Sequence, residues 1–391
     1  MKYARRLDTI SPFRVVELLE RAKALEADGF HVVHLEVGEP DFPTADPILE
    51  AGHAALASGA TKYTQALGIP ALRERIAEHY AKTSNLTLAP ERVVVTAGAS
   101  AGLMLLSALL LDPGDELLLT DPGYPCNEVF VSLVNGVPLR IPLDADRGFQ
   151  FGLDEVTGLW SPRTRGMLVA SPANPTGAVL SRALLQSLAA ELDRRSGFLI
   201  LDEIYQGLVY GEDIGYRSGL EVTDDAFILN SFSKYFGMTG WRLGWMVVPQ
   251  AAVDGVARLA QNLFISPASL SQHAALAAFE PAAMAVHEAR REAFGRRMTL
   301  LADGLEQLGF RLPARPRGAF YLYVDVSAFG IDALEFCWKL LEDYHVAATP
   351  GIDFGDHNAS RFVRFAFTTA ESQIALALER IAQALRDWGV A

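Results

Sequence analysis

Cysteine and positive charge are both scarce in this chain. Only two cysteines occur among the 391 residues, Cys126 and Cys337, and they form neither a CxxC pair nor the spacing of a metal site. Lysine and arginine total 34 against 47 aspartates and glutamates, so the formal net charge is −13. A nucleic-acid partner requires clustered positive charge, and this balance disfavours one. Two ordinary thiols in a reducing compartment are expected.

Long hydrophobic runs are missing as well. Apolar stretches such as 101–111 are far shorter than the roughly 20 residues that span a membrane. The basic N-terminus is not followed by the apolar segment of a signal peptide. We therefore expect a cytoplasmic protein with no membrane partner. Half of the residues are hydrophobic, and a chain of this length is expected to form two domains.

Short apolar runs alternate with segments of helical length between residues 90 and 250. The runs are 93–95, 117–119, 167–170, 198–201, 226–229 and 243–248. Runs of this kind are typical of parallel strands buried on both faces. The centre of the chain is therefore predicted to be an α/β domain with a mostly parallel sheet.

The C-terminal part has a different pattern, which predicts a smaller α+β domain. Its expected elements are a helical region at 255–309, strands at 319–326 and 362–367, and an amphipathic helix at 370–388. A helix near 12–29 is expected to join them. The predicted limits are 46–280 for the large domain, and 1–45 together with 281–391 for the small one.

Side chains with useful chemistry follow five of the predicted strands. They are the small residues of 96–102, then Tyr124, then Asn174, then Asp202 with Tyr205, and finally Ser231 with Lys234. Ligands of open α/β sheets bind beyond the carboxyl ends of the strands. One binding site is therefore expected to use all five strand ends.

Lys234 and Asp202 carry the most specific chemistry. Lys234 closes the apolar run 226–232, and a desolvated amine is a nucleophile toward carbonyls. A surface lysine in a loop is the alternative. Asp202 ends a buried strand and needs a cationic or hydrogen-bonding partner. A pyridine N–H would be one, and a protonated ring is an electron sink. The alternative for Asp202 is a helix N-cap.

Other candidates are less specific when taken alone. Ser231 and Arg242 are plausible phosphate ligands beside a helix that starts near Ala99 and Ser100, or else a loop residue and a surface cation. Asn174 and Tyr205 could donate to a phenolate oxygen. The alternatives are a turn marked by Asn-Pro and a partly buried aromatic. Tyr124 could stack on a flat ring or simply occupy a turn.

Arg364 alternates along its predicted strand so that it shares a face with Phe362 and Ala366. An arginine on an apolar face must meet an anion. A substrate carboxylate is one candidate, and an internal aspartate or glutamate is the other.

Together these residues resemble the class I/II aminotransferases, fold-type-I pyridoxal-phosphate enzymes that include aspartate and alanine aminotransferases. The matching motifs are VGEPDF at 37–42, KYT at 62–64, GIP at 68–70 with LR at 72–73, SPANPTG at 171–177, DEIY at 202–205, SFSK at 231–234, GWRLG at 240–244 and FVR at 362–364. They cover nearly the whole chain in order. The resemblance implies a large domain with a seven-stranded, mostly parallel sheet flanked by helices, and a smaller α+β domain built from both chain ends.

The resemblance also implies pyridoxal 5'-phosphate as the cofactor and a role for each motif around it. Lys234 matches the lysine that links to the cofactor and moves the proton, and Asp202 matches the partner of the ring nitrogen. Asn174 and Tyr205 match the groups at the ring hydroxyl, and Tyr124 the stacked aromatic. The phosphate cradle matches Ala99, Ser100, Ser231 and Arg242.

The remaining matches concern the substrate and the second subunit. Gly38 and Arg364, with Asn174, match the substrate carboxylate site, and the 174–175 bond matches one that the family holds cis. Tyr63 matches a tyrosine that reaches the phosphate of the neighbouring subunit, which implies a homodimer with shared active sites. The implied activity moves the amino group of an L-amino acid to a 2-oxo acid, such as 2-oxoglutarate, by a ping-pong mechanism.

Three positions depart from the aspartate-specific relatives. Ser100 stands where some bacterial aspartate aminotransferases carry a lysine for the distal carboxylate, and Phe13 where they have a smaller or polar residue near the substrate entrance. A neutral or aromatic donor becomes at least as plausible as aspartate. Asn127 occupies a position that is often aromatic, and no role follows for it.

Two alternative functions stay open. Another fold-type-I enzyme of the same cofactor, such as a C–S β-lyase, a decarboxylase or a cyclopropane-forming relative, would use the same residues. Residues 98–102 also satisfy G-x-S-x-G, the nucleophile elbow of serine hydrolases, with Ser100 as nucleophile and His345 or His357 downstream. That function would leave Lys234 and Asp202 without a role.

Overall fold

A seven-stranded sheet lies at the centre of the computed structural model, which describes residues 1–10, 12–211 and 215–390. Its strands are β2 (Val93–Thr96), β3 (Glu116–Asp121), β4 (Val137–Pro142), β5 (Thr164–Ala170), β6 (Phe198–Asp202), β7 (Phe227–Ser231) and β8 (Gly244–Val247). The spatial order is β2-β8-β7-β6-β5-β3-β4, and all pairs except those of β8 are parallel. The predicted α/β class is confirmed.

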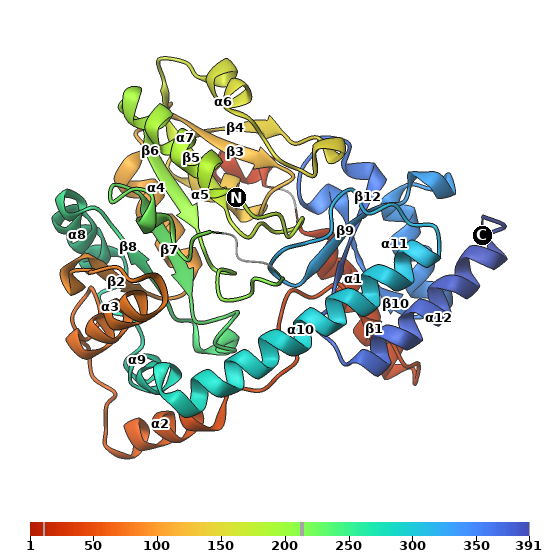
Figure 1. Cartoon of the computed structure of the whole chain (residues 1–391), viewed down its shortest axis with the longest axis horizontal. Helices are drawn as coiled ribbons and strands as arrows, with labels where there is room; N and C mark the ends of the chain where they lie inside the picture. Colours follow the sequence, from red (N-terminus) through yellow and green to blue (C-terminus); the bar gives the residue numbers. More distant parts are fainter. Residues whose placement is uncertain (11, 212–214, 391) are drawn as a thin grey trace.

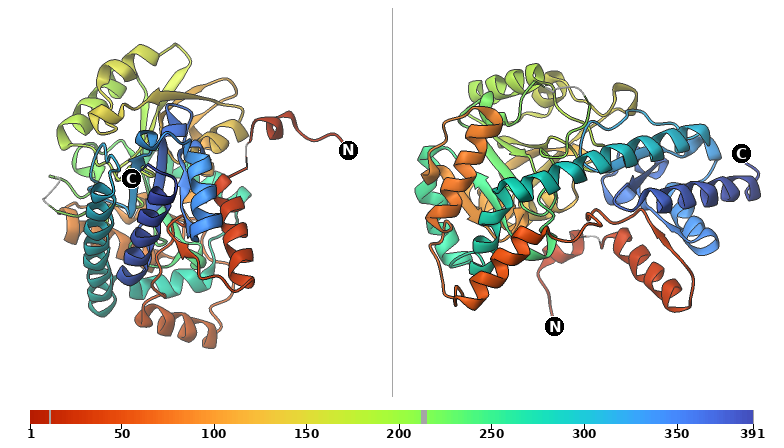
Figure 2. Two further views of the ribbon diagram at one scale, coloured as in Figure 1. Left: turned by 90° about the vertical axis from the view of Figure 1, so that its right-hand side faces the viewer. Right: turned by 60° about the horizontal axis from the view of Figure 1, so that its bottom comes forward.

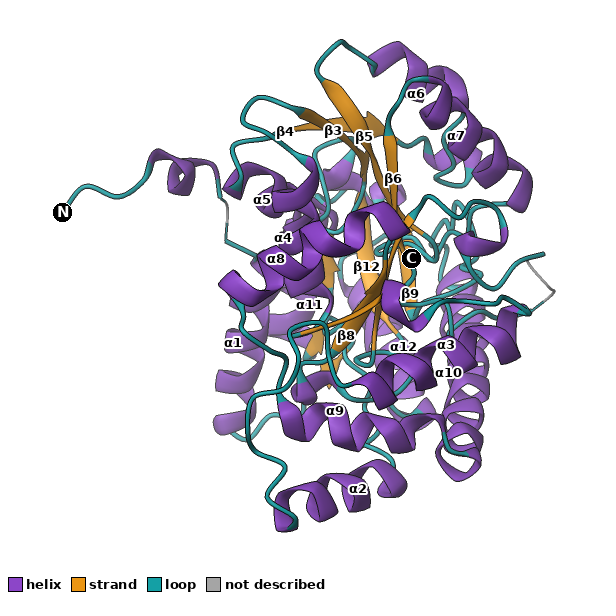
Figure 3. Ribbon diagram, turned by 90° about the vertical axis from the view of Figure 1, so that its left-hand side faces the viewer, coloured by secondary structure: helices purple, strands orange, loops and turns teal. Residues whose placement is uncertain are grey.

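Helices enclose this sheet, as Figure 1 and Figure 3 show. They are α2 (Asp46–Ala57), α3 (Pro70–Ser84), α4 (Ala99–Leu110), α5 (Cys126–Leu133), α6 (Leu153–Leu159), α7 (Arg182–Arg194), α8 (Val253–Leu263) and α9 (Ser269–Leu276). Successive side chains of a strand point to opposite faces. Leu117 and Leu119 accordingly belong to one hydrophobic cluster and Leu118 to the other. Both faces are buried, which explains the continuous apolar runs.

Two strands differ from the sequence-based expectation. The run at 243–248 was expected to be parallel, but β8 is antiparallel to both of its neighbours. The segment 232–243 contains no crossover helix, which a parallel return would need. The seventh strand, β4, has no continuous apolar run because it contains Pro138 and Pro142. Proline is tolerated there since β4 forms the edge of the sheet.

A second, smaller group of strands lies beside the large sheet. β9 (Tyr321–Asp325), β11 (Thr349–Pro350) and β12 (Phe362–Ala366) form an antiparallel sheet, and β1 (Val33–His34) pairs with β10 (Val346–Ala347). The helices α1 (Arg14–Ala27), α11 (Ala333–Tyr344) and α12 (Glu371–Asp387) accompany them. The β1–β10 pair joins the two ends of the chain.

The helical region expected at 255–309 is divided into α8, α9 and the long α10 (Pro281–Gln307). In Figure 1, α10 runs from the helices around the large sheet to the smaller group of strands. The domain limits at residues 46 and 281 stay predictions. Figure 2 shows the first ten residues projecting from the body of the molecule. No helix in the described part of the chain is sufficiently long and apolar to cross a membrane.

Candidate active site

A cavity of about 530 Å³ lies beyond the carboxyl ends of the parallel strands. Eleven of the twelve predicted site residues line it: Gly38, Ala99, Ser100, Tyr124, Asn174, Asp202, Tyr205, Ser231, Lys234, Arg242 and Arg364. The exception is Tyr63, which is 81% exposed and does not line the cavity of its own chain. The residues that the strand-end rule selected therefore line one cavity.

The amine of Lys234 is buried in this cavity. Its Nζ donates to the carbonyl oxygen of Gly38 at 2.7 Å and lies 5.9 Å from the centre of the Tyr205 ring. Burial lowers the pKa of Lys234 to about 8. A larger fraction of this amine is therefore neutral near pH 7 than of an exposed lysine, and the neutral amine is the nucleophile.

Asp202 ends β6 on the floor of the cavity and is 4% exposed. The backbone N–H of Ile204 donates to its Oδ1 at 3.1 Å. Burial raises the pKa of this carboxyl to about 7. A cationic N–H placed beside the carboxylate would offset its desolvation, so the residue fits the ring nitrogen of pyridoxal phosphate.

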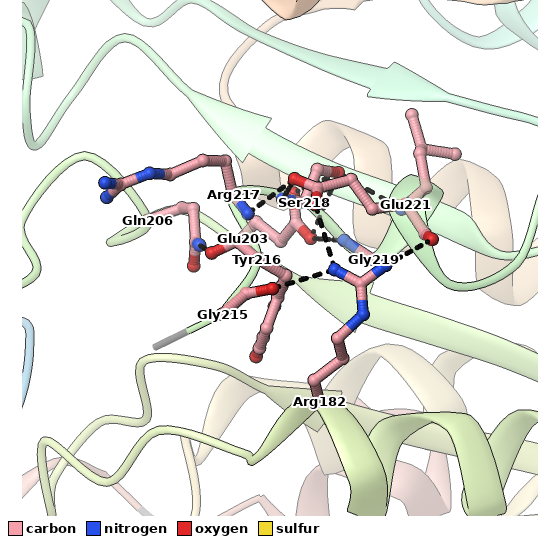
Figure 4. Close-up of polar contacts among 10 residues, drawn as sticks. Arg182, Glu203, Gln206, Gly215, Tyr216, Arg217, Ser218, Gly219 and Glu221 are labelled. Carbon is pink, nitrogen blue, oxygen red and sulfur yellow. Dashed lines mark hydrogen bonds and ion pairs between the residues drawn. The ribbon is translucent and has the colours of Figure 1, made fainter. Parts of the chain in front are cut away.

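A hydrogen-bonded network surrounds Glu203, the residue that directly follows β6 (Figure 4). The Glu203 carboxylate accepts from the Ser218 hydroxyl at 3.0 Å and from the Gly219 N–H at 2.6 Å. Arg182 donates to the carbonyls of Gly215 and Glu221, at 2.7 and 3.1 Å. Burial raises the pKa of Glu203 to about 8. This network attaches the end of β6, which carries Asp202, to the loop that contains Ser218 and Gly219.

One end of the cavity is suited to a phosphate. Helix α4 begins there at Ala99, directly after Gly98, whose φ is +79° and which provides no side-chain cap. Arg242 donates to the Thr239 carbonyl at 2.9 Å and pairs with no carboxylate among the described residues. The Ser231 hydroxyl accepts from the Ser233 N–H at 3.0 Å. Free amides, a hydroxyl and an unpaired guanidinium are typical phosphate ligands.

Arg364 is 5% exposed at the other end of the cavity. It donates to Asn174 Oδ1 at 3.1 Å and to the Glu36 carbonyl at 2.5 Å, and its buried Nε has no partner. Within the described ranges it forms no ion pair, so the internal carboxylate considered as an alternative is not found. A guanidinium that lines the cavity and has no carboxylate partner among the described residues fits an external carboxylate.

Several residues of the site were missed by the sequence analysis. The Tyr321 hydroxyl lies 2.8 Å from that of Tyr205, and its ring lies 4.3 Å from the Arg364 guanidinium carbon. Only tertiary structure brings this strand residue to the site. Ser233 also lines the cavity, and its place just before Lys234 was a usable signal.

Phe13 and Asn127 line a neighbouring cavity of about 600 Å³. Tyr124 is a wall of both cavities. Asn127 is buried, and its Oδ1 has no hydrogen-bond partner. Phe13 and Asn127, which both depart from the family pattern, thus lie beside Tyr124, the aromatic residue predicted to stack on the cofactor.

The serine-hydrolase alternative receives no support from the geometry. Ser100 lies in the first turn of α4, and none of the described residues lining its cavity is a histidine. The His345 ring packs on Phe30, and His357 contacts Asn358. The general base that a serine nucleophile needs is missing from the lining of this cavity.

A buried reactive amine at the strand ends of an α/β sheet, with a carboxylate and a guanidinium beside it, is typical of enzymes that bind a carbonyl cofactor through lysine. The family described as aminotransferase class I and II matches residues 31–381, and this chain belongs to it. It is an aminotransferase, and this family is generally dependent on pyridoxal phosphate.

Relatives of known name match over almost the whole chain. Valine–pyruvate aminotransferase of Mycobacterium tuberculosis is 38% identical, over 95% of this chain and 96% of its own length. Aspartate/prephenate aminotransferase of Thermus thermophilus is 36% identical, over 98% of both chains. Among solved structures, an aminotransferase from M. tuberculosis has a TM-score of 0.95 at 38% identity, covering 99% of this chain and 100% of that one. The T. thermophilus aspartate aminotransferase with maleate has 0.92 at 35% identity, covering 98% and 100%.

Proposed function

We propose that this aminotransferase uses pyridoxal 5'-phosphate to move the amino group of an L-amino acid to a 2-oxo acid, with 2-oxoglutarate as the acceptor. The observation that carries the proposal is one cavity that buries the Lys234 amine, the Asp202 carboxyl and the Arg364 guanidinium without an ion-pair partner. The two substrates would use the same carboxylate site in turn, and this supports a ping-pong mechanism.

Each end of the cavity fits one part of the cofactor. Ala99, Ser100, Ser231 and Arg242 would hold the phosphate, and Asp202 the ring nitrogen. Asn174 and Tyr205 would hold the ring hydroxyl, and Tyr124 would stack on the ring. When bound, the cofactor supplies an aldehyde for amines and a ring that withdraws electrons.

The substrate would be held at the opposite end. Arg364 has an unused Nε, and Asn174 and Gly38 lie beside it, so these residues would bind the α-carboxylate. Lys234 Nζ would then accept the proton from the substrate Cα and return it, because a neutral amine in this cavity is a competent base. The Tyr205 hydroxyl, which is hydrogen-bonded to that of Tyr321, would hold the ring hydroxyl of the cofactor in place.

The proposal includes neutral and aromatic donors on an equal footing with aspartate. The cations lining the cavity of one chain are Lys234, Arg242 and Arg364, and each already has a role. Ser100 supplies no charge for a distal carboxylate. Valine–pyruvate and aspartate/prephenate aminotransferases have similar sequence identities to this chain, so these relatives do not favour one amino donor over another.

A homodimer with shared active sites is part of the proposal. Tyr63 is 81% exposed, and Leu263, Phe264 and Ile265 are exposed by 51%, 39% and 55%. The two segments are neighbours, since the Thr64 N–H donates to Ser266 Oγ at 3.4 Å. An exposed apolar group of this kind is typical of an interface between subunits. A cytoplasmic location stays a prediction from the composition.

The test is a spectroscopic half-reaction. The purified protein is saturated with pyridoxal phosphate, mixed with each of the twenty amino acids, and followed by the visible absorbance of the bound cofactor, with 2-oxoglutarate added to reverse the change. Conversion by several donors is expected, with the absorbance band of the lysine-linked cofactor lost in Lys234→Ala. Borohydride should fix the cofactor to residue 234. Release of a lyase product without conversion would replace transfer by β-elimination, and no adduct at residue 234 would refute the proposal.

A further inference from the structure

One buried carboxylate beside the active site has no role in the chemistry described so far. The Glu36 side chain is fully buried, its Oε1 lies 2.6 Å from His34 Nδ1, and its Oε2 has no partner. The other ring nitrogen of His34 lies 3.2 Å from Glu26 Oε1 of α1. Burying a carboxylate is costly unless it is paired, so the His34–Glu36 contact sets where Glu36 can lie.

The backbone of the same residue begins a segment that contacts Arg364 and Lys234, two of the three cations that line the cavity. The Glu36 carbonyl accepts from Arg364 Nη2 at 2.5 Å and from Thr349 Oγ1 at 3.0 Å. Two residues further on, the Gly38 carbonyl accepts from Lys234 Nζ at 2.7 Å. Segment 36–38 therefore determines how the carboxylate-binding group and the reactive amine are aimed.

Backbone contacts hold only the start of this segment. The Leu35 N–H donates to the Ala347 carbonyl at 3.0 Å, and the Ala366 N–H donates to the Leu35 carbonyl at 2.6 Å. Beyond Leu35 the segment leaves the strands and lines the cavity. There the hydroxyls of Thr349 and Thr368 donate to the carbonyls of Glu36 and Val37, both at 3.0 Å, and the contact with His34 fixes the Glu36 side chain.

We propose that the ion pair of His34 and Glu36 is a positioning element, which holds segment 36–38 so that Arg364 faces the substrate carboxylate. The inference rests on the proposed role of Arg364. It predicts a defect in the affinity for both substrates, since donor and acceptor share that carboxylate site, and a smaller effect on the chemical step.

The charge on His34 gives the element a pH dependence. Glu36 and Glu26 face the imidazole, and Arg380 of α12 donates to the backbone carbonyls of His31 and His345. The hydrogen bond to Glu36 raises the pKa of His34 to about 9. His34 is therefore cationic below pH 9, and this ion pair weakens as the pH rises through that value.

The experiment compares steady-state kinetics of cofactor-loaded variants. His34→Leu leaves Glu36 unpaired, and the double variant His34→Leu/Glu36→Leu removes both partners. Replacing a buried pair by apolar side chains restores stability, whereas removing one partner does not. Glu342→Gln is the matched control, because it removes a carboxylate from the Arg21 pair, away from segment 36–38. Arg364→Ala reports on the carboxylate site itself.

The double variant is expected to raise KM for the donor and for 2-oxoglutarate by roughly tenfold, the cost of misplacing one charged hydrogen bond, with kcat changed about twofold or less. Its thermal stability should stay near that of the wild type. Wild-type KM for 2-oxoglutarate, which does not itself titrate there, should rise above pH 9, and the double variant should lack this step.

Either of two results would overturn the inference: a folded double variant with wild-type KM values, or equal KM increases in the Glu342→Gln control. If His34→Leu does not fold, the double variant decides. Failure of the proposed function is distinguishable, because then Arg364→Ala would leave KM unchanged for every substrate.

Discussion

At the residue scale, the site is a set of charges that the fold keeps out of water. Asp202 and Lys234 have pKa values of about 7 and 8 because burial disfavours their charged forms, by opposite signs for acid and base. Neither value is useful for folding. Both would favour the binding of a cofactor with a cationic ring nitrogen and an aldehyde. The free energy of unfolding of the cofactor-free protein should therefore be measurably lowered by these buried groups.

Asp202→Asn measures that cost. The pKa of Asp202 is raised in the folded state, so the folded protein binds the proton more tightly, and the destabilisation grows as the pH rises from about 4 to above 7. The cofactor-free variant should therefore be more stable than the wild type at pH 8, by on the order of 3 kcal/mol. Thermal unfolding of both proteins measures the difference. At pH 4 it should vanish, and a constant difference at both pH values would contradict the assignment.

At the element scale, strand ends and helix starts place the reactive groups. Gly98 ends the loop after β2 with φ +79°, and a Cβ there would lie 2.7 Å from Arg242 Nη2. This turn is the contact between the start of α4 and Arg242, the arginine proposed to bind the phosphate. Any side chain on it must displace Arg242 or strain the backbone.

Gly98→Ala is therefore expected to weaken cofactor binding. A left-handed alanine costs about 1–3 kcal/mol, and the displaced guanidinium adds a loss that is specific to the phosphate. Dissociation constants for pyridoxal phosphate should rise about tenfold or more. Gly114→Ala is the control, because Gly114 has φ +89° with nothing within 4 Å of the added Cβ. Equal cofactor affinity in the two variants would show that strain alone is responsible.

Local signals explain which elements and site residues could be predicted from the sequence. Lys234 and Asp202 follow buried apolar runs directly, so the strand-end rule located them without tertiary information. Tyr321 and Glu36 were missed because their roles depend on contacts with residues far away in the chain, Tyr205 and Arg364. The antiparallel direction of β8 and the edge strand β4 were missed for the same reason, since pairing partners leave no mark on a short run.

At the scale of the whole molecule, the proposed homodimer gives Tyr63 a role in the cavity of the second subunit. Tyr63 lies outside the cavity of its own chain, beside the exposed Leu263, Phe264 and Ile265. In a dimer with shared sites, each active site would combine Lys234 of one subunit with Tyr63 of the other. Two inactive variants, each lacking one of these two residues, can therefore form one intact site in a mixed dimer.

Mixing Tyr63→Ala with Lys234→Ala subunits should restore activity that neither variant has alone. A hybrid dimer contains one doubly altered site and one intact site, so random mixing should recover about a quarter of the wild-type rate. Steady-state assays before and after subunit exchange measure the recovery. Lys234→Ala mixed with Asp202→Asn is the control, since both changes fall in one cavity and each hybrid site retains one defect. No recovery in the first mixture would exclude shared sites.

The layout of the cavity has a consequence for how such a protein changes over generations. Within one chain, the groups suited to the cofactor come from residues 99–242, with Asn174 also facing the substrate, whereas Gly38 and Arg364 come from segments near opposite ends of the chain. Mutations at the substrate end would therefore change substrate specificity without lowering the affinity for the cofactor. Substrate preference can therefore change by single substitutions while each intermediate variant keeps its cofactor and its activity.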